Sequence, residues 1–519
     1  MNEIELKFQV PPTQAAALAR AVATASAQVI RLQAAYADTA DRRLAAAGLA
    51  LRLRREGRRW VQTLKGRGDG LMARPEHEVP VAGGAALPAF DAKRHAGLPV
   101  GERLIALLAD GAPLQVLYRT DIRRTLRRLR SAGAMVELAH DRGHIEAAGQ
   151  RLAVNELEFE LLAGPSAALV ALAGRWVVRH GLWWDVRTKS ERGFRLAEGL
   201  HEVPAVHAAP SAVAEGQTPG QALAAMLHGA LSQVLPNAAE IAAGTAAPEH
   251  LHQLRVGLRR LRSVLREAAP LAGVAAAEAL ALDRDWARPF GALGAARDAD
   301  VLAGDLAPEL DAALAAAGLP PLVWPVEAVG SKPEPAAVLR GAEVQTLLLR
   351  SLALALTSAQ PDLASSPADG PGPGGKLQAA EEAAVQTAAQ PFGRADAAAL
   401  LQPLWKRVKR GARGISAASP EALHTLRKRA KRLRYLMEAL APLLPPKRLR
   451  RAIAALKPAL NCLGELNDLH TADARLAAHS EPTASAWFVR GLLAERRRQG
   501  LPAAQRALAT VFEAPPPWR

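Results

Sequence analysis

Glu3-Ile4-Glu5-Leu6-Lys7 stands at the start of the 519-residue chain and alternates charged with apolar residues. On a β-strand, Glu3, Glu5 and Lys7 share one face, while Ile4 and Leu6 share the other. Taken alone, such a row is most often the solvated face of an antiparallel sheet. The same alternation recurs later in the chain. This repetition favours a second interpretation, in which charged faces line one enclosed site.

Two further rows have the same pattern. Glu156, Glu158 and Glu160 form an acidic row, and Arg52 and Arg54 form a basic one. Like charges on one strand repel each other unless opposite charge lies between them. Paired carboxylates suit hard divalent cations, which also keep substrate phosphates as ligands, and arginine suits phosphate oxygens. Together the rows predict a barrel or tunnel lined with charge and suited to a metal-bound oligophosphate.

Composition limits the class of protein. Cys462 is the single cysteine, which excludes an internal disulfide framework and a cysteine-based zinc site. The formal net charge of +16 predicts a polyanionic partner, and only 4% of the residues are aromatic, which favours phosphate chains over stacked bases. No apolar run of about 18 residues is present, and Glu3, Glu5 and Lys7 interrupt any leader segment. We therefore expect a cytoplasmic protein, associated with polyphosphate granules if it binds that polymer.

The chain divides into a β-rich part and a helical part. We expect a first domain at 1–200, a linker at 201–217 and a helical domain at 218–512, whose halves at about 218–355 and 377–512 flank a flexible loop at 361–376. Alternation predicts strands at Glu3–Val10, Leu49–Arg54, Trp60–Lys65, Glu76–Val81, Ile122–Arg130, Met135–His140 and Asn155–Leu161. Helical patches are expected at about 12–27, 101–109 and 165–180.

The helical part contains two similar basic rows. The first row is His252, Arg255, Arg259 and Arg262, and the second is His424, Arg427, Lys431 and Arg434. Steps of three and four residues place each row on one helical stripe, and each member of the second row follows its counterpart by 172 residues. A basic stripe is usually a solvated helix face. Repetition and the absence of acids from the stripes favour instead an internal duplication that lines one basic groove.

The motifs of the first 195 residues resemble the CYTH family, also known as the triphosphate tunnel metalloenzymes. After the opening triplet, the chain contains in the order of that family Tyr36-Ala37-Asp38-Thr39, Gly48–Arg54, Thr63-Leu64-Lys65, Arg74-Pro75-Glu76-His77-Glu78, Tyr118–Asp121 with Arg123 and Arg124, Glu137 and Asp141, Glu156-Leu157-Glu158, and Trp184–Phe194 with Lys189. A lone triplet is a weak signal, whereas this ordered series is specific.

This resemblance implies an antiparallel eight-stranded tunnel that hydrolyses or cyclises triphosphates with Mg²⁺ or Mn²⁺. It assigns catalytic roles to Glu3, Glu5 and Lys7. The implied metal ligands are Glu3, Glu5, Glu78, Asp141, Glu156 and Glu158. The implied phosphate-binding residues are Lys7, Arg52, Arg54, Lys65, Arg119, Arg124 and Lys189. Two choices stay open. Either Glu76 or Glu78 could be the site residue, because both lie on the same strand face. Only one of Arg123 and Arg124 can enter the tunnel, because they point to opposite faces.

The helical part resembles the CHAD domain, on its two histidine-led basic rows and on Arg297-Asp298-Ala299-Asp300. The second copy departs from that last motif, with Asn467-Asp468-Leu469-His470 in its place, which puts the role of this position in doubt. The family implies a helical bundle that binds inorganic polyphosphate along its basic surface. By this resemblance both rows, from His252 to Arg262 and from His424 to Arg434, are polyphosphate-binding.

Three functions remain for testing. The first is a metal-dependent hydrolase that converts tripolyphosphate to pyrophosphate and phosphate, with polyphosphate bound by the helical domain. The second is an adenylate cyclase, or a hydrolase of nucleoside or thiamine triphosphates, that uses the same tunnel. The third is a non-catalytic polyphosphate-binding scaffold. Nucleic-acid binding would also explain the charge, but the sequence has no motif specific for it.

Overall fold

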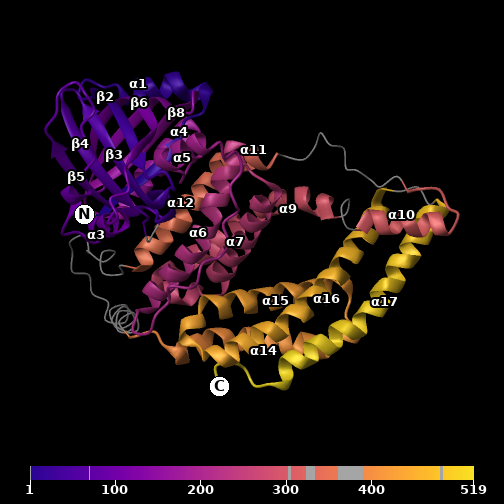
Figure 1. The fold of residues 1–519 in the computed structure, drawn as a ribbon. Helices are drawn as coiled ribbons and strands as arrows, with labels where there is room; N and C mark the ends of the chain where they lie inside the picture. Colours follow the sequence, from indigo (N-terminus) through magenta and orange to yellow (C-terminus); the bar gives the residue numbers. More distant parts are fainter. Residues whose placement is uncertain (1, 69–70, 302–305, 323–333, 360–389, 480–482) are drawn as a thin grey trace. The chain divides into compact units, whose positions relative to one another are not determined.

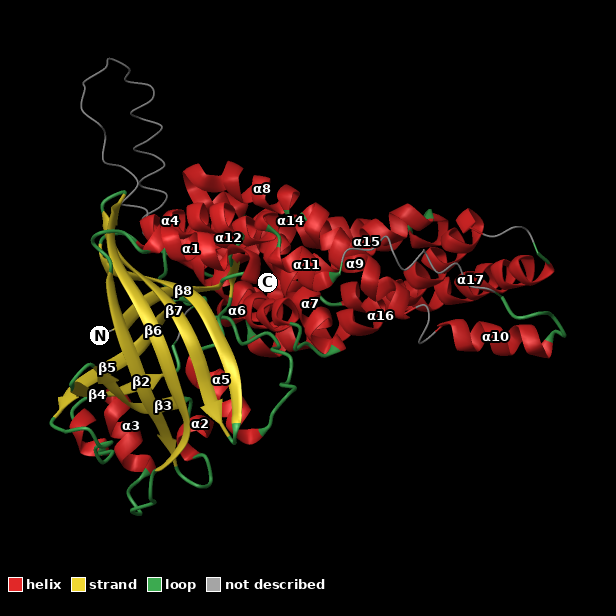
Figure 2. Ribbon diagram, turned by 90° about the horizontal axis from the view of Figure 1, so that it is seen from above, coloured by secondary structure: helices red, strands yellow, loops and turns green. Residues whose placement is uncertain are grey.

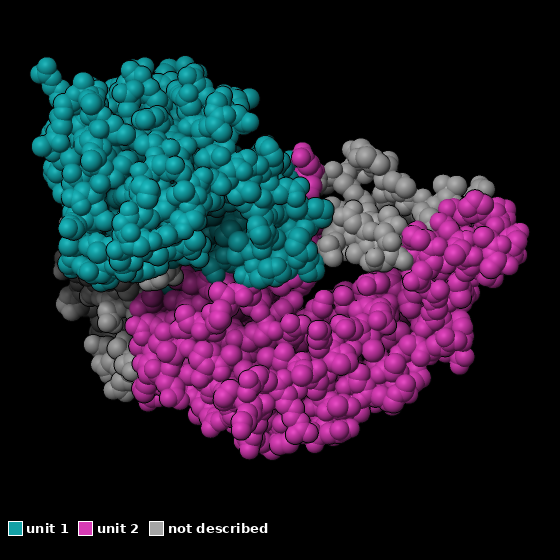
Figure 3. Space-filling model, viewed as in Figure 1, with its two compact units in different colours: residues 1–207, 231–254, 336–356 teal, residues 208–230, 255–335, 357–519 magenta. Residues whose placement is uncertain are grey.

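A computed structural model describes the chain except residues 1, 69–70, 302–305, 323–333, 360–389 and 480–482, and at 2, 295–301 and 479 it describes the backbone alone (Figure 1). The loop predicted at 361–376 lies outside the described residues. The chain forms two compact units (Figure 3). Unit 1 is Met1–His207, Leu231–Leu254 and Ala336–Leu356, and unit 2 is Ala208–Ala230, Arg255–Pro335 and Thr357–Arg519.

Eight antiparallel strands of unit 1 close into a barrel, which confirms the predicted architecture (Figure 2). The strands are β1 (Asn2–Gln9), β2 (Gln28–Asp38), β3 (Leu49–Glu56), β4 (Arg59–Gly66), β5 (Ala73–Val81), β6 (Gln115–Ser131), β7 (Ala134–Ala147) and β8 (Gln150–Ala163). Their order is β5-β4-β3-β2-β6-β7-β8-β1, and β5 pairs back to the start of β1. A short ninth strand, β9 (Trp183–Trp184), pairs with the end of β1.

Apolar residues cover the outside of the barrel. Leu6, Phe8 and Phe159 are fully buried, and Phe8 meets Phe159 edge to face at 5.7 Å. Phe159 in turn contacts Trp176 of α4 (Ser166–His180), with ring centroids 6.2 Å apart. On another wall, Leu51 packs in a cluster with α3 (Pro99–Leu107). The apolar alternate positions of the strands therefore face outward under helices, which leaves the charged positions facing inward.

One helix packs against the inner face. α5 (Lys189–Glu198) follows its N-cap Thr188, whose hydroxyl accepts a hydrogen bond from the backbone N–H of Glu191. Phe194, Leu196 and Ala197 pack against an inner apolar cluster that includes Tyr36, Tyr118 and Ile122. Gly193 permits this approach, since a Cβ there would lie 2.3 Å from the Tyr118 ring. The glycine therefore sets how closely the charged start of α5 approaches the strands.

The remaining described elements are mostly helical. Beside the barrel lie η1 (Pro12–Gln14), α1 (Ala15–Val22), α2 (Arg43–Ala46) and η2 (Ala92–His95). Further on come α6 (Pro219–Ala243), α7 (Pro248–Glu267), η3 (Ala269–Ala275), α8 (Ala276–Asp285), α9 (Ala287–Val301), α10 (Ala307–Ala316), α11 (Pro335–Arg340), α12 (Ala342–Ala359), α14 (Arg394–Arg413), η6 (Ile415–Ala417), α15 (Pro420–Ala439), η7 (Ala441–Leu443), α16 (Pro446–His479) and α17 (Ala484–Glu513). None of the described helices is long and apolar enough to cross a membrane.

The two predicted basic rows lie on helices of equal length. α7 and α15 each have 20 residues, and both begin with Pro-Glu. The guanidinium of Arg255 in α7 lies against Gly294 of α9, and that of Arg427 in α15 lies against Gly464 of α16. In both halves, the second residue of the basic row therefore lies against a glycine of a later helix, as a duplication predicts.

A buried histidine pair on the outer wall predicts a pH dependence of stability. His95 is fully buried, with its Nδ1 2.9 Å from Nδ1 of His77 and its Nε2 3.0 Å from the Gln62 amide nitrogen. That amide also donates to the Asp91 carbonyl, so Nε2 of His95 accepts and has no room for a proton. Burial lowers the pKa of His95 to about 4, with further contributions from His77 and Arg94.

His95 binds a proton near pH 6.5 in the unfolded chain but only near pH 4 in the folded chain. The free energy of unfolding is therefore highest above pH 6.5 and decreases as the pH falls from 6.5 to 4. In His95→Gln, the free energy of unfolding should decrease by about 2 kcal/mol less over this pH range than in the unmodified chain. Urea unfolding at pH 7.5, 5.5 and 4.5 measures it, with exposed His207→Gln as control. An unchanged slope with pH in His95→Gln would contradict this account.

Candidate active site

Strand register places the charged rows side by side on the inner face. Across β1, β8 and β7, Lys7 lies opposite Glu158, and Glu5 lies opposite Glu160. Glu156 lies opposite Asp141, which in turn lies opposite Arg124 of β6. Hairpin pairing brings β6, β7 and β8 together, and β1, which is distant in the sequence, pairs with β8 on the other side. The alternation seen in the sequence therefore becomes one continuous charged surface.

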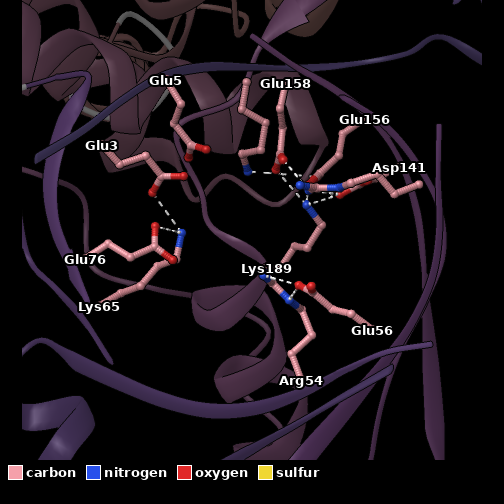
Figure 4. Close-up of polar contacts among 12 residues, drawn as sticks. Glu3, Glu5, Arg54, Glu56, Lys65, Glu76, Asp141, Glu156, Glu158 and Lys189 are labelled. Atoms are coloured by element: carbon pink, nitrogen blue, oxygen red, sulfur yellow. Dashed lines mark hydrogen bonds and ion pairs between the residues drawn. The ribbon is translucent and has the colours of Figure 1, made fainter. Parts of the chain in front are cut away.

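Three carboxylates of this surface converge on one lysine (Figure 4). Oxygen atoms of Asp141, Glu156 and Glu158 lie within 4.8 Å of one another. The ammonium of Lys189, at the start of α5, lies 2.7 Å from Asp141 and 2.7 Å from Glu158 and also contacts Glu156. Asp141 and Glu156 are fully buried. We call these three carboxylates the acidic cluster.

Two arginines complete the neutralisation of the acidic cluster. Arg124 donates to both oxygens of Asp141, at 2.6 and 2.7 Å, and also contacts Glu158. Arg192, one turn after Lys189, contacts Glu156. Burial by itself would raise the pKa of Glu158, but Lys189 and Arg124 hold it at about 2. Glu158 is therefore ionised at neutral pH. The three carboxylates in turn raise the pKa of Lys189 above its ordinary value despite burial.

Lys7 lies deeper in the same wall. Its side chain is 4% exposed, its ammonium donates to the Arg187 carbonyl, and it lies 3.9 Å from Glu156. Burial lowers the pKa of Lys7, although Glu156 and Asp185 oppose this shift. Gln9 bridges Glu156 and Asp185 at 3.2 and 3.0 Å. The end of β1 is thus tied to the segment that precedes α5.

The opposite wall carries the second set of ion pairs (Figure 4). Lys65 lies between Glu3 and Glu76, 2.8 Å from each. Arg52 lies 3.6 Å from Glu76 and 3.5 Å from Glu78. The remaining pairs of this wall are Arg54 with Glu56 and Glu78, and Arg74 with Glu5. Both Glu76 and Glu78 thus face the interior, and Glu76 is the more buried, with 14% against 41% of the side chain exposed.

The carboxylates between the two walls have fewer cationic partners. Burial raises the pKa of Glu3, and burial together with Glu158 and Glu3 raises that of Glu5. Glu160 shows the largest such effect, since burial and the charges of Glu3 and Glu137 raise its pKa to about 7. Like charges that repel one another in this way are stabilised by a cation placed among them.

These donors fit a hard divalent cation. Glu3, Glu5 and the acidic cluster offer carboxylate oxygens alone, which are the ligands that Mg²⁺ and Mn²⁺ prefer. Burial, followed by neighbouring carboxylates, raises the pKa of Glu3 and of Glu5. A cation bound beside them would stabilise their ionised forms.

One residue assigned to phosphate binding faces the wrong way. Arg119 is exposed on the outside of β6, opposite Ala35 and Glu146. It lies five residues from Arg124, an odd number, so the two side chains point to opposite faces of the strand. Arg123 shares the outer face with Arg119 and is also exposed. The structure therefore brings Arg124 into the interior and leaves Arg119 and Arg123 outside.

The structure adds Arg74 and Arg192 to the interior set, and it also places there Glu76, which the sequence left open against Glu78. Arg74 lies 3.2 Å from Glu5, Glu76 shares Lys65 with Glu3, and Arg192 contacts Glu156. Arg74 and Glu76 alternate with Glu78 along β5, so strand periodicity was the available signal. Arg192 lies three residues after Lys189, on the same face of a helix.

Cations of the two helical basic rows also come together, within unit 2. Burial, followed by the charges of Arg427 and Arg259, lowers the pKa of Lys431 to about 7, and Arg255 adds to this effect. Arg259 and Arg255 belong to the first row, whereas Lys431 and Arg427 belong to the second. Cations from both halves therefore lie near one another. We call Arg255, Arg259, Arg427 and Lys431 the basic cluster.

The ends of these rows differ from expectation. Arg262 donates to Asp283 of α8 at 2.9 Å, and Arg434 donates at 2.7 Å to Glu438, four residues on in α15, so an acid ends the second stripe. His424 Nδ1 lies 2.5 Å from the Asn467 side-chain oxygen. His252 lies on α7, partly buried. The side chains of the predicted motif Arg297–Asp300 lie outside the described residues.

Comparisons with known proteins match the β-rich part and the helical part of the chain to two separate domain models. Residues 1–180 match the model of the CYTH domain, and residues 225–477 match the model of the CHAD domain. An inorganic triphosphatase of Haemophilus influenzae is 29% identical over 202 residues, which are 38% of this chain and 55% of that protein. The chain thus spans about half the length of this curated relative.

Two solved structures illustrate the separate parts. A CHAD domain from the plant Ricinus communis is 25% identical, with 59% of this chain and 96% of that chain covered and a TM-score of 0.39. An adenylyl cyclase candidate from Hippeastrum, described as having a dominant triphosphatase activity, is 19% identical, with 38% of this chain and 96% of that chain covered and a TM-score of 0.28. On the two family-model matches alone, the chain contains a CYTH domain at residues 1–180 followed by a CHAD domain at residues 225–477.

Proposed function

We propose that this chain is a metal-dependent inorganic triphosphatase, which hydrolyses tripolyphosphate to pyrophosphate and phosphate, and that its helical region binds polyphosphate. The observation that supports the enzyme is the arrangement of opposite charges within one barrel. Carboxylates of β1, β7 and β8 share the interior with cations of β3 and β4 on one wall and of α5 on the other. A short, highly charged phosphate chain needs both sets, the cations for its oxygens and the carboxylates for its metal ion.

The residues divide into two roles. Arg52, Arg54 and Lys65 would bind phosphate oxygens from one wall, and Arg124 and Lys189 would bind them from the other. Glu3, Glu5 and the acidic cluster would hold Mg²⁺ or Mn²⁺, with Glu78 at the edge of this set. When bound, such an ion supplies charge neutralisation at the phosphates and activation of a water molecule. Lys7 would hold the end of the phosphate chain in line for attack.

Two observations favour tripolyphosphate as the substrate. The curated relative is named an inorganic triphosphatase, and the net positive charge of the chain suits inorganic phosphate chains. Adenylate cyclase and hydrolysis of nucleoside or thiamine triphosphate use the same phosphate chemistry. A turnover comparison of tripolyphosphate, ATP and thiamine triphosphate separates them. If the folded protein hydrolyses none of the three with either Mg²⁺ or Mn²⁺, the remaining function is that of a non-catalytic polyphosphate-binding scaffold.

Substitution of the opening strand tests the active site. Glu5→Ala should lower kcat for tripolyphosphate at least about 100-fold, because it removes an interior carboxylate that no neighbour replaces. Lys7→Ala should raise KM, because it removes a buried cation from the phosphate path. Phosphate release under saturating Mg²⁺ or Mn²⁺ measures both.

Glu146→Ala is the matched control, since Glu146 lies on the outer face of β7 opposite Arg119. It should retain the activity of the unmodified chain. Equal losses in Glu5→Ala and Glu146→Ala would contradict the assignment of the interior as the active site.

The basic cluster predicts pH-dependent polyphosphate binding. Because Lys431 has a pKa of about 7, it is mostly neutral at pH 8 and mostly charged at pH 6. Affinity for long-chain polyphosphate should therefore rise roughly tenfold from pH 8 to pH 6. Lys431→Arg, which is charged throughout, should bind at both pH values alike.

Calorimetry in metal-free buffer at several salt concentrations measures this binding, with Arg506→Ala on α17 as an exposed control. Lys431→Ala should weaken binding and make the salt dependence less steep, by about one unit of the logarithmic slope. Equal affinity for DNA of the same charge would indicate a general polyanion site. Unchanged binding in Lys431→Ala would exclude the basic cluster.

A further inference from the structure

The start of α5 belongs to a segment that closes the interior. We define the closing segment as Trp183–Arg192, which comprises β9, the turn after it and the first residues of α5. It supplies Lys189 and Arg192 to the acidic cluster. Its Arg187 carbonyl accepts the hydrogen bond of Lys7. Three cations of the proposed active site therefore depend on where this segment lies.

The closing segment has little secondary structure of its own. β9 has two residues and pairs only with Phe8 and Gln9 of β1 among the described strands. One further backbone hydrogen bond joins the N–H of Asp185 to the Lys7 carbonyl at 3.0 Å. So short a strand at the edge of a sheet is not stable by itself. Its position must therefore be set by neighbouring side chains.

A buried carboxylate from α6 holds two arginines of this region. Glu240, whose side chain is 4% exposed, accepts from Arg195 at 2.6 Å and from Arg187 at 3.5 Å. Thr245 donates to Glu240 at 2.6 Å and thereby fixes the carboxylate. Arg187 also pairs with Asp185 through both carboxylate oxygens, at 2.9 and 3.0 Å. A carboxylate so buried between two guanidinium groups has no solvent to replace either partner.

A second contact comes from α12. The side-chain oxygen of Gln345 accepts from the backbone N–H of Trp184 at 2.7 Å, and its nitrogen donates to the Leu339 carbonyl at 2.7 Å. Gln345 is 2% exposed. Arg340 lies over the Trp183 ring at 5.9 Å and donates to the Ala242 carbonyl at 2.6 Å. α12 thus contacts the start of the closing segment, and α6 contacts its middle, at Arg187, and the part of α5 that follows it, at Arg195. All these residues belong to unit 1 (Figure 3).

We propose that Glu240 and Gln345 are positioning residues for the barrel site. They hold the closing segment so that Lys189 and Arg192 meet the acidic cluster and the Arg187 carbonyl meets Lys7. Both residues lie within 225–477, the part that matches the CHAD model. The barrel site is therefore complete only when these helices are present. The kinetic part of this proposal rests on the proposed triphosphatase function.

The test uses the full chain with Glu240→Gln and Gln345→Leu. Each should lower kcat/KM for tripolyphosphate about 10-fold to 100-fold, the usual effect of losing a partner that orients an active-site residue. Each should also speed amide hydrogen exchange in residues 183–192. Glu267→Gln is the matched control, because Glu267 is a buried carboxylate between Arg407 and Arg432, at 3.2 and 3.0 Å, in unit 2.

The control separates positioning from general stability. If Glu240→Gln and Glu267→Gln lower the melting temperature alike, but only Glu240→Gln lowers kcat/KM and speeds exchange at 183–192, the proposal holds. Wild-type kcat/KM and exchange in both test variants would overturn it. Should Glu240→Gln fail to fold, Gln345→Leu decides by the same two measurements.

Failure of the triphosphatase function has a different signature. In that case the unmodified chain would release no phosphate, and tripolyphosphate binding in metal-free buffer would replace turnover as the readout. Weaker binding together with faster exchange in Glu240→Gln would then support positioning of the cations by Glu240. Unchanged binding and unchanged exchange would overturn it.

Discussion

A closed barrel directs every second residue of its strands toward one enclosed space, and here many of those residues are charged, beside the inner apolar cluster. Water cannot screen such charges well, so each needs an opposite charge within reach. Lys189 among three carboxylates and Lys65 between two are the central examples. Neither contact exists on any single strand. The charged interior therefore depends on correct closure, and closure depends on the apolar faces that α3 and α4 cover from outside.

Strand periodicity predicted most of the barrel. All seven segments expected as strands lie in strands, although β6, β7 and β8 extend well beyond them because hairpin pairing continues past the apolar residues. β2 at Gln28–Asp38 was absent from the expected strands. Its alanines carry little β propensity, and its place in the sheet comes from pairing with β3 and β6 on either side. Tertiary pairing, which the local sequence does not contain, decided this element.

The active-site set shows the same limit. Parity along a strand identified Glu3, Glu5, Arg52, Arg54, Glu156 and Glu158 as inward-facing, and the structure places them there. The alternation of side chains along β6 predicts that Arg119 and Arg124 point to opposite faces. The family resemblance had assigned both residues to phosphate binding and so missed this difference. Glu240 and Gln345 carry no sequence signal at all. They act on a segment about 50 and 160 residues away in the chain, and only the folded unit brings them to it.

The helical halves have unequal freedom to vary. In the first half a Cβ at position 294 would lie 2.5 Å from the Arg255 guanidinium, so glycine is required there while the arginine keeps its place. In the second half the corresponding distance, from position 464 to Arg427, is 3.6 Å, which accommodates a methyl group. The second half also carries Asn467-Asp468 where the first has Arg297-Asp298. A methyl group at position 294 would therefore displace the Arg255 guanidinium, whereas one at position 464 would leave the Arg427 guanidinium in place.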